Sequence, residues 1–356
     1  MTKSASFRVL SAVGILAVAA MVSTPVAAKD WWPFKIAAAK NGDLKDVRTI
    51  DYVPLTKASK PWTLCVLIPH LKDSYWISVD YGIVEEAKRL GVKVNVLSAG
   101  GYDQLPKQLS EWDDCVAAKA DAILLSAISE AGFAAKLKEA DSKGFVVVAV
   151  GNPILEAPIT ARVTPDFYQM GKETGEFLKK HLGDKNGVAA GFPGPQGSGW
   201  AETYMSGFRD STKTGNIKLA AEIYGEPGVP QSLQLVEDAL QTYPDLNVIW
   251  GGAPAAEAAV SAVASAGRDD VSIVSSYENQ TMLKLVQAGK VLAFATDYPV
   301  MTGRLSVDLA VRALEKQPHE KVILTAPGIV STDSVAKFDL TQIFAPEGWK
   351  PEFNVK

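Results

Sequence analysis

Short, nearly continuous apolar runs recur along the chain and alternate with segments of helical periodicity. The runs expected to form strands are 62–69, 92–97, 122–126, 145–150, 186–192, 218–224, 248–251, 271–275 and 291–295. Early runs are spaced by about 30 residues, the length of one β-α unit. Between them apolar residues recur at helical spacing, as at Ile83, Ala87 and Leu90. Strands that are apolar on both faces indicate parallel sheets covered by helices on both sides.

This alternation changes at three places, where we expect the chain to cross between two lobes. An extended segment at 159–163 precedes a helix expected over 166–182, and further crossings are expected near 296–297 and 324–329. The predicted fold is therefore α/β, with two doubly wound Rossmann-like lobes joined by a multi-crossing hinge. The expected divisions are an N-terminal arm (29–61), an N-terminal lobe (62–160 plus about 297–325), and a C-terminal lobe with its tail (161–296 plus about 326–356).

The N-terminus has the pattern of a secretory signal. Lys3 and Arg8 are the only charged residues before an apolar run of about 14 residues, and small residues lead up to Ala28. We expect a signal peptide over 1–28, cleaved after Ala28. An uncleaved anchor is the alternative, but the run is shorter than the ~20 residues that span a bilayer. The mature protein is thus expected to be exported, and periplasmic if the source is Gram-negative.

Export changes the reading of the two cysteines. In an oxidising compartment, Cys65 and Cys115 are expected to form a structural disulfide. Two buried thiols are the alternative. The chain has no C-x-x-C motif, so a redox site is not expected.

Composition excludes several classes of function. The 36 Lys and Arg against 40 Asp and Glu, a net charge of -4, argue against nucleic acid as a partner. Two Cys and three scattered His offer no zinc-site spacing, so no metal is expected. The glycine-rich loop at 193–200 lacks both the phosphate-loop and the dinucleotide fingerprints, so no cofactor is expected either.

Ligands of such sheets bind beyond the carboxyl ends of the strands, where aromatic and acidic residues gather in this chain. The residues of interest there are Asp73, Tyr75, Trp76, Tyr102, Phe167, Trp200, Tyr277 and Asp297. Any single aromatic of this set can equally be a core residue, and Asp73 can simply cap the helix that follows it. Their recurrence at corresponding topological places favours an aromatic-lined cleft between the lobes.

Several segments together carry a family resemblance. They are 62–65, 71–76 (Leu-Lys-Asp-Ser-Tyr-Trp), 80–82, 99–102, 121–125, 169–171, 193–195, 207–209 and 255–259. With them the chain resembles the type I periplasmic binding-protein superfamily, and within it the periplasmic sensors of trimethylamine N-oxide (TMAO). The resemblance implies two Rossmann-like lobes around a hinge, an aromatic box for the ligand, and a membrane sensor histidine kinase as partner.

The resemblance also implies roles for individual residues. Asp73, Tyr75, Trp76 and Tyr102 would come from the first lobe, and Tyr277 would be a wall from the second. The family has a tryptophan where this chain reads Asp-Phe-Tyr-Gln-Met-Gly at 166–171, so Phe167 is the positional match. Phenylalanine is a weaker cation–π partner than tryptophan, and Trp200 in the next loop is expected to compensate.

The chemistry of TMAO suits such a site. Aromatic faces hold methylated ammonium groups at roughly 0.5–2 kcal/mol per contact. The oxide needs donors, which Tyr hydroxyls, a Trp N–H or backbone N–H groups can supply. An ionised Asp73 only accepts hydrogen bonds, so we expect it near the cationic end of the ligand or orienting a donor.

Two other functions compete with a TMAO sensor. A substrate-binding protein of an ABC importer, possibly for a sugar, has the same fold. An exported enzyme would use Asp73, Asp166 and Asp297 as acid and base. Because the sequence around Ser198 is not a G-x-S-x-G elbow and no His lies near a candidate nucleophile, no catalytic residue and no enzymatic activity are expected.

Overall fold

The computed structural model describes residues 1–2, 30–43 and 46–356. The signal peptide expected over 1–28 lies, apart from its first two residues, outside the described part of the chain. The architecture that follows is that of residues 32–356. Within the described residues, no helix has the length and apolar character needed to cross a membrane.

Nine strands of the described chain form the first sheet, in the order β15-β4-β3-β5-β6-β7-β13-β1-β2. Their bounds are β1 (Phe34–Ala39), β2 (Arg48–Tyr52), β3 (Thr63–Ile68), β4 (Lys93–Ser98), β5 (Ala122–Leu125), β6 (Val146–Val150), β7 (Ala161–Pro165), β13 (Val322–Thr325) and β15 (Asn354–Val355). The ladders from β4 to β13 are parallel. The additions at the two edges, β1 with β2 and β15, are antiparallel.

Six strands of the described chain form the second sheet, in the order β14-β12-β11-β10-β8-β9. They are β8 (Gly187–Phe192), β9 (Ile217–Glu222), β10 (Val248–Gly251), β11 (Ser272–Ser275), β12 (Ala293–Thr296) and β14 (Gly328–Ser331). All pair in parallel except β14, which is antiparallel to β12. All of the strands expected from apolar runs are therefore present, and the two-lobe α/β prediction is confirmed.

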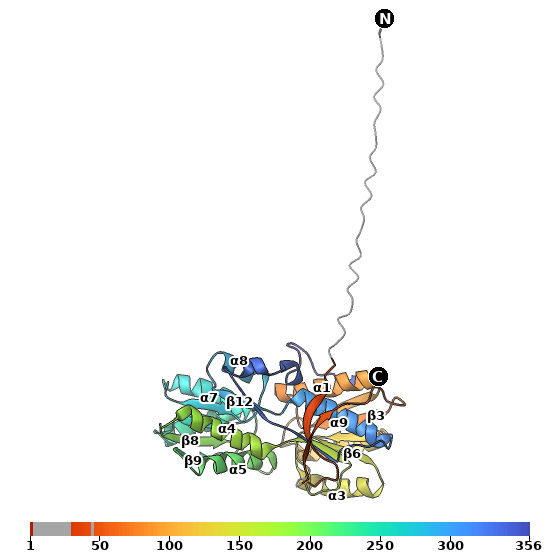
Figure 1. The fold of residues 1–356 in the computed structure, drawn as a ribbon, viewed down its shortest axis with the longest axis horizontal. Coiled ribbons are helices and arrows are strands. Elements are labelled where there is room, and N and C mark those ends of the chain that lie inside the picture. The colour runs from red at the N-terminus through yellow and green to blue at the C-terminus, as the bar shows by residue number, and fades with distance from the viewer. Residues whose placement is uncertain (3–29, 44–45) are drawn as a thin grey trace. The chain divides into compact units, whose positions relative to one another are not determined.

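Helices cover each sheet and define two lobes (Figure 1). The first lobe has α1 (Ser74–Leu90), α2 (Leu105–Ala117), α3 (Glu130–Ser142) and α9 (Pro299–Leu314). The second lobe has α4 (Phe167–Leu182), α5 (Trp200–Thr212), α6 (Val229–Thr242), α7 (Ala253–Ser265) and α8 (Gln280–Gln287), and the short turns η1 (Val335–Lys337) and η2 (Leu340–Gln342) follow β14. Within the lobes, α1 packs on α9 and α4 packs on α5.

The first sheet is buried on both faces, as a continuous apolar strand requires. Leu64 and Leu67 of β3 are both fully buried. Cys65 and Leu67 join Trp112 of α2 and Phe133 of α3 in one apolar cluster. The expected disulfide links Cys65 to Cys115, with their Cα atoms 5.8 Å apart, and so ties α2 to β3.

The chain passes between the sheets after β7, after β12, between β13 and β14, and again between β14 and β15. Two short ranges sit elsewhere than the sequence placed them. Residues 161–165 and 354–355 were expected with the second lobe, but their strands, β7 and β15, are hydrogen bonded in the first sheet. The first crossing therefore comes after Pro165, and the tail returns to the first lobe to cover the edge of β4. The N-terminal arm expected over 29–61 contains β1 and β2, which extend the same sheet.

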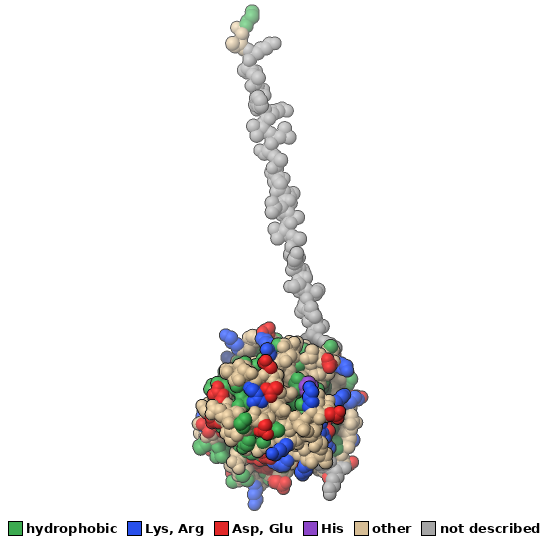
Figure 2. Space-filling view, turned by 90° about the vertical axis from the view of Figure 1, so that its left-hand side faces the viewer, with side chains coloured by type: hydrophobic (Ala, Val, Ile, Leu, Met, Phe, Trp, Pro, Cys, Tyr) green, Lys and Arg blue, Asp and Glu red, His purple; other side chains and the backbone are tan. Residues whose placement is uncertain are grey.

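The surface mixes charges of both signs. On the face shown in Figure 2, Lys and Arg side chains are interspersed with Asp and Glu. This agrees with the near balance of 36 basic and 40 acidic residues.

Candidate ligand-binding site

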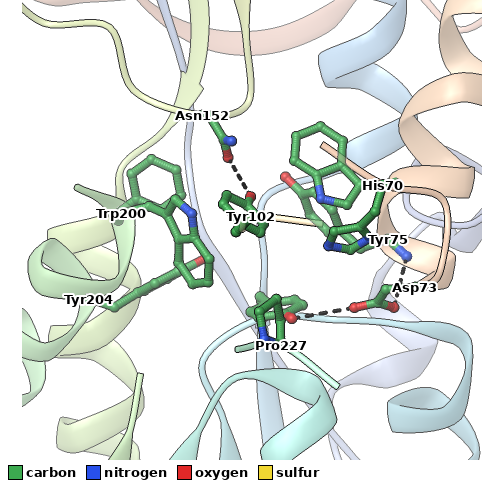
Figure 3. Close-up of a pocket in the computed structure, with 11 residues that line it drawn as sticks. His70, Asp73, Tyr75, Tyr102, Asn152, Trp200, Tyr204 and Pro227 are labelled. Atoms are coloured by element: carbon green, nitrogen blue, oxygen red, sulfur yellow. Dashed lines mark hydrogen bonds between the residues drawn. The ribbon is translucent and has the colours of Figure 1, made fainter. Parts of the chain in front are cut away.

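A pocket lies where the strand ends of the two sheets face each other (Figure 3). The first lobe lines it with His70, Asp73, Tyr75, Trp76, Tyr102 and Asn152, and the second with Phe167, Trp200, Tyr204, Pro227 and Tyr277. They surround about 400 Å³ of space not filled by atoms, part of it open to solvent. Because both lobes supply walls, a ligand held here touches both.

The first turn of α1 supplies the first-lobe wall. The Asp73 carboxylate caps this helix by accepting a hydrogen bond from the Tyr75 N–H (3.2 Å), which fixes where the helix begins. Tyr75 and Trp76 follow directly and project into the pocket. Gly151, which follows β6, makes room for the indole, since a Cβ there would lie 3.3 Å from the Trp76 ring.

Helix starts in the second lobe supply the opposite wall. Asp166 caps α4 by accepting from the Gln169 N–H (3.0 Å), and this sets Phe167 at the pocket. Trp200 is the first residue of α5. Gly194 has a positive φ of 129°, and a Cβ there would collide with the indole of Trp200. A glycine is therefore needed at 194 both for the turn and for the seat of Trp200.

The aromatic rings contact one another edge to face around the pocket. Centroid distances are 5.3 Å for Tyr75–Trp76, 5.6 Å for Tyr75–Tyr277, 6.4 Å for Tyr277–Trp200 and 5.6 Å for Trp200–Tyr102. Such T-shaped pairs are the favoured arrangement of aromatic rings. The pairs Tyr75–Tyr277 and Tyr102–Trp200 each join one lobe to the other, so the wall is continuous across the cleft.

Tyrosine hydroxyls tie this wall together. The Tyr277 hydroxyl donates to Asp73 (3.3 Å) across the cleft, and the Tyr102 hydroxyl donates to the Asn152 side-chain oxygen (3.0 Å). The Tyr75 hydroxyl donates to Asp297 (2.8 Å). Burial raises the pKa of Tyr75, Tyr102 and Tyr277, so these hydroxyls keep their protons at neutral pH.

Two buried side chains of the pocket have polar atoms without a hydrogen-bond partner among the described residues. Both ring nitrogens of His70 and the Trp200 indole N–H make no hydrogen bond within the described residues. The indole N–H groups of Trp76 and Trp200 approach the Tyr102 hydroxyl, but that of Trp200 lies outside hydrogen-bonding geometry. Burial, helped by the charge of Lys72, lowers the pKa of His70 to about 4, so at neutral pH its ring offers one donor and one acceptor.

The pocket carries negative charge. Burial raises the pKa of Asp73 to about 6, against opposing hydrogen bonds from the Tyr75 N–H and neighbouring side chains. Asp73 is therefore mostly ionised at pH 7. Among the described residues that line the pocket, none is Lys or Arg. A carboxylate among aromatic faces favours a ligand with a positive end.

Asp297 is the one residue of the predicted set that does not line the pocket. It is fully buried behind Tyr75, next to Glu278, whose carboxylate accepts from the Thr296 hydroxyl (2.6 Å) and the Asp297 N–H (3.2 Å). Burial raises the pKa of both carboxylic acids. The place of Asp297 indicates that it orients Tyr75.

Sequence reasoning missed four residues that line the pocket: His70, Asn152, Tyr204 and Pro227. His70, Asn152 and Pro227 each follow a strand of the sheets, so their position carried a signal. Their residue types carried no such signal, since the spacing of His70 from the other histidines fits no metal site. Tyr204 lies one turn beyond Trp200 on α5, where helical spacing would have found it.

A scan of family models places the fold in a known group. The periplasmic binding protein domain matches residues 64–318. The chain belongs to the periplasmic binding protein family. Members of this family bind ligands, which agrees with a pocket between lobes. The periplasmic protein TorT of Escherichia coli (strain K12) is 30% identical over 300 residues, 83% of this chain and 86% of TorT.

Solved structures of family members are similar throughout the two lobes. An ABC transporter solute binding protein from Bradyrhizobium sp. BTAi1, with bound Bis-Tris, has 39% identity and a TM-score of 0.80, and the match covers 92% of this chain and all of that one. A complex of TorT with the TorS sensor domain in the presence of TMAO has 29% identity and a TM-score of 0.75, with 82% and 99% coverage. These relatives include a protein that forms a complex with a sensor domain and a solute binding protein of an ABC transporter.

Proposed function

We propose that the protein is a periplasmic receptor that binds TMAO or a related methylated amine in this pocket and signals to a membrane sensor histidine kinase. The observation that carries the proposal is the lining of the pocket. Among the described residues, it combines aromatic faces from both lobes with one carboxylate and neither Lys nor Arg. The 30% identity to TorT and the TorT–TorS structure with TMAO support the same reading.

Each end of a methylated amine oxide finds its chemistry in the pocket. The methylated nitrogen packs against Trp76, Trp200 and Tyr277, each contact contributing roughly 0.5–2 kcal/mol. The unpartnered Trp200 N–H and a His70 N–H are the donors for the oxide. Asp73 stands on the cationic side, held there by the Tyr277 hydroxyl.

Ligand contact with both lobes explains how binding would become a signal. A ligand that touches both walls favours the closed arrangement of the lobes over an open one. The kinase would read the surface that closure creates. In this proposal Tyr75 has a second role, because its bond to Asp297 joins the pocket wall to the crossing after β12.

A second candidate function is the substrate-binding protein of an ABC importer, possibly for a sugar. The 39% identity to the Bradyrhizobium ABC transporter solute binding protein favours it. Sugars also stack on aromatic rings, but they need several hydrogen-bonding groups around their hydroxyls. Here the tyrosine hydroxyls Tyr75, Tyr102 and Tyr277 already donate to protein oxygens.

Calorimetric titration of the mature protein separates the two functions. The panel is TMAO, trimethylamine, glycine betaine, and common pentoses and hexoses. The proposal expects saturable binding of a methylated amine, lost in Trp76→Ala and kept in Trp349→Ala, which removes a partly buried Trp packed on Tyr81 outside the pocket. Binding of a sugar with no response to any methylated amine would refute it. Ligand-dependent capture of a sensor-kinase periplasmic domain tests the signalling half.

A further inference from the structure

A second, acidic hollow adjoins the aromatic pocket. It shares His70, Asp73 and Pro227 with the pocket, and it encloses about 1380 Å³ of space, part of it open to solvent. We call this hollow the vestibule. It is formed by the loops after β3, β4, β9 and β11 and by the start of α7. Because these three residues line both spaces, the vestibule lies directly against the pocket.

The vestibule carries an excess of negative charge. Among the described residues, its lining includes the carboxylates of Asp73, Asp103, Glu226 and Glu257 and one Lys or Arg side chain, that of Lys72. The salt bridges of the described residues include none of these four carboxylates. Repulsion between Asp103 and Glu226 adds to burial in raising the pKa of Glu226. The charge of the vestibule is thus not consumed by internal pairing.

An independent observation indicates that this junction holds a ligand. His70 is 3% exposed, lines both spaces, and has no hydrogen-bond partner for either ring nitrogen within the described chain. Burying polar groups without partners is costly, so such a side chain is expected where a ligand or its polar arm completes the bonding. Asp73 stands at the same junction.

We propose that, among methylated amines, this site selects net-cationic alkylammonium ions over the neutral N-oxide, with Asp73 as the counter-ion and the vestibule carboxylates drawing the cation toward it. The inference rests on the proposed function of the same pocket and narrows its ligand class. A charged, low-dielectric cleft concentrates ions of the opposite sign and speeds their entry. A neutral N-oxide gains no net attraction from the vestibule field, and its oxide offsets most of the attraction between its nitrogen and Asp73.

Two probes of nearly equal size and shape, tetramethylammonium and TMAO, differ in net charge and in the ability of the oxide to accept hydrogen bonds. The wild-type protein is expected to bind tetramethylammonium more tightly. A cation beside a carboxylate lowers the pKa of that carboxylate by about 1–3. By linkage, the cation binds about 10- to 1000-fold more tightly when the carboxylate is ionised than when it is neutral. Asp73→Asn should therefore weaken the affinity for tetramethylammonium by about that factor and change the affinity for TMAO by less than about threefold. Asn keeps the cap of α1, so the fold is preserved.

Asp339→Asn is the matched control, because Asp339 caps η2 by accepting from the Thr341 N–H (3.1 Å) and lines neither the pocket nor the vestibule. It should leave both dissociation constants unchanged. The vestibule is tested by Glu226→Gln with Glu257→Gln, followed by stopped-flow tryptophan fluorescence. Tetramethylammonium should associate more slowly and with a weaker salt dependence, while TMAO association stays the same.

Tighter binding of TMAO than of tetramethylammonium, with equal effects of Asp73→Asn on both, would overturn this inference and leave the proposed function standing. Failure of both probes and of every other methylated amine would overturn the proposed function itself.

Discussion

Replacing Trp200 by Phe tests whether the pocket presents a donor to an N-oxide. The Trp200 indole is 6% exposed and its N–H has no acceptor in the described chain. Phe keeps an aromatic face toward Tyr102, Tyr204 and Tyr277, whose ring centroids lie 5.6, 6.0 and 6.4 Å from that of Trp200. The substitution therefore removes the donor while it preserves most of the wall.

The expected losses differ between the two probes. A hydrogen bond to a charged oxygen contributes about 1.5–3 kcal/mol, so TMAO affinity should fall by about 10- to 150-fold. Tetramethylammonium accepts no hydrogen bond. It loses only the difference in cation–π attraction between an indole and a phenyl face, about 1 kcal/mol or less, so its affinity should fall by no more than about fivefold. The free energy of unfolding should change little, because two effects oppose each other. The smaller ring leaves a gap, which is destabilising, but it removes a buried N–H whose lack of a partner costs about 1–3 kcal/mol.

Calorimetry with both ligands, and urea unfolding of each variant, measure these effects. Trp112→Phe is the control: Trp112 is buried against Phe133 of α3, away from the pocket, so this change should lower stability and leave both affinities intact. Equal losses of TMAO and tetramethylammonium in Trp200→Phe would refute the assignment of this N–H as the oxide donor.

Three further predictions concern stability. Burial raises the pKa of Asp80 to about 7 from 3.8. The native state therefore loses stability as pH rises from about 4 to about 7. Asp80→Asn should add roughly 2–4 kcal/mol to the free energy of unfolding at pH 8 and little at pH 4. A pH-independent gain in urea titrations would contradict this. A Cβ at Gly207 would collide with the Tyr168 carbonyl oxygen. Gly207→Ala should therefore force α5 away from α4, lower the free energy of unfolding by about 1–3 kcal/mol and weaken ligand binding. An unchanged urea midpoint and an unchanged affinity would contradict this. Replacing Cys65 and Cys115 by Ser opens a loop of 50 residues. Because the disulfide restricts the unfolded chain, its loss should lower the free energy of unfolding by about 4 kcal/mol, and reductant should reproduce this loss in the wild type. Equal stability of the protein with and without the disulfide would contradict this prediction.

The architecture could be predicted because its strands carry the information themselves. Buried parallel strands must be apolar on both faces, and runs such as Thr63–Ile68 and Val248–Gly251 are recognisable without knowing their neighbours. The apolar pattern does not identify β15. Asn354–Val355 pairs with β4 only because the tail is carried back to that edge, which is a tertiary effect.

The candidate site was predictable in position and less so in detail. Strand ends identified the residues that gather at the pocket, since parallel strands bring their carboxyl ends to one edge. Whether a side chain meets the ligand or stands behind one that does depends on geometry that sequence lacks, as Asp297 behind Tyr75 shows. His70 went unrecognised because its lack of partners is visible only once its burial is known.

A crystal structure of the mature protein grown with a methylated amine is the most direct test of the proposed site. We expect one ligand between the lobes, with its methyl groups against Trp76, Trp200 and Tyr277 and its nitrogen on the side of Asp73. A methylated amine bound outside this pocket, or a sugar filling the pocket in crystals that take up no methylated amine, would contradict it.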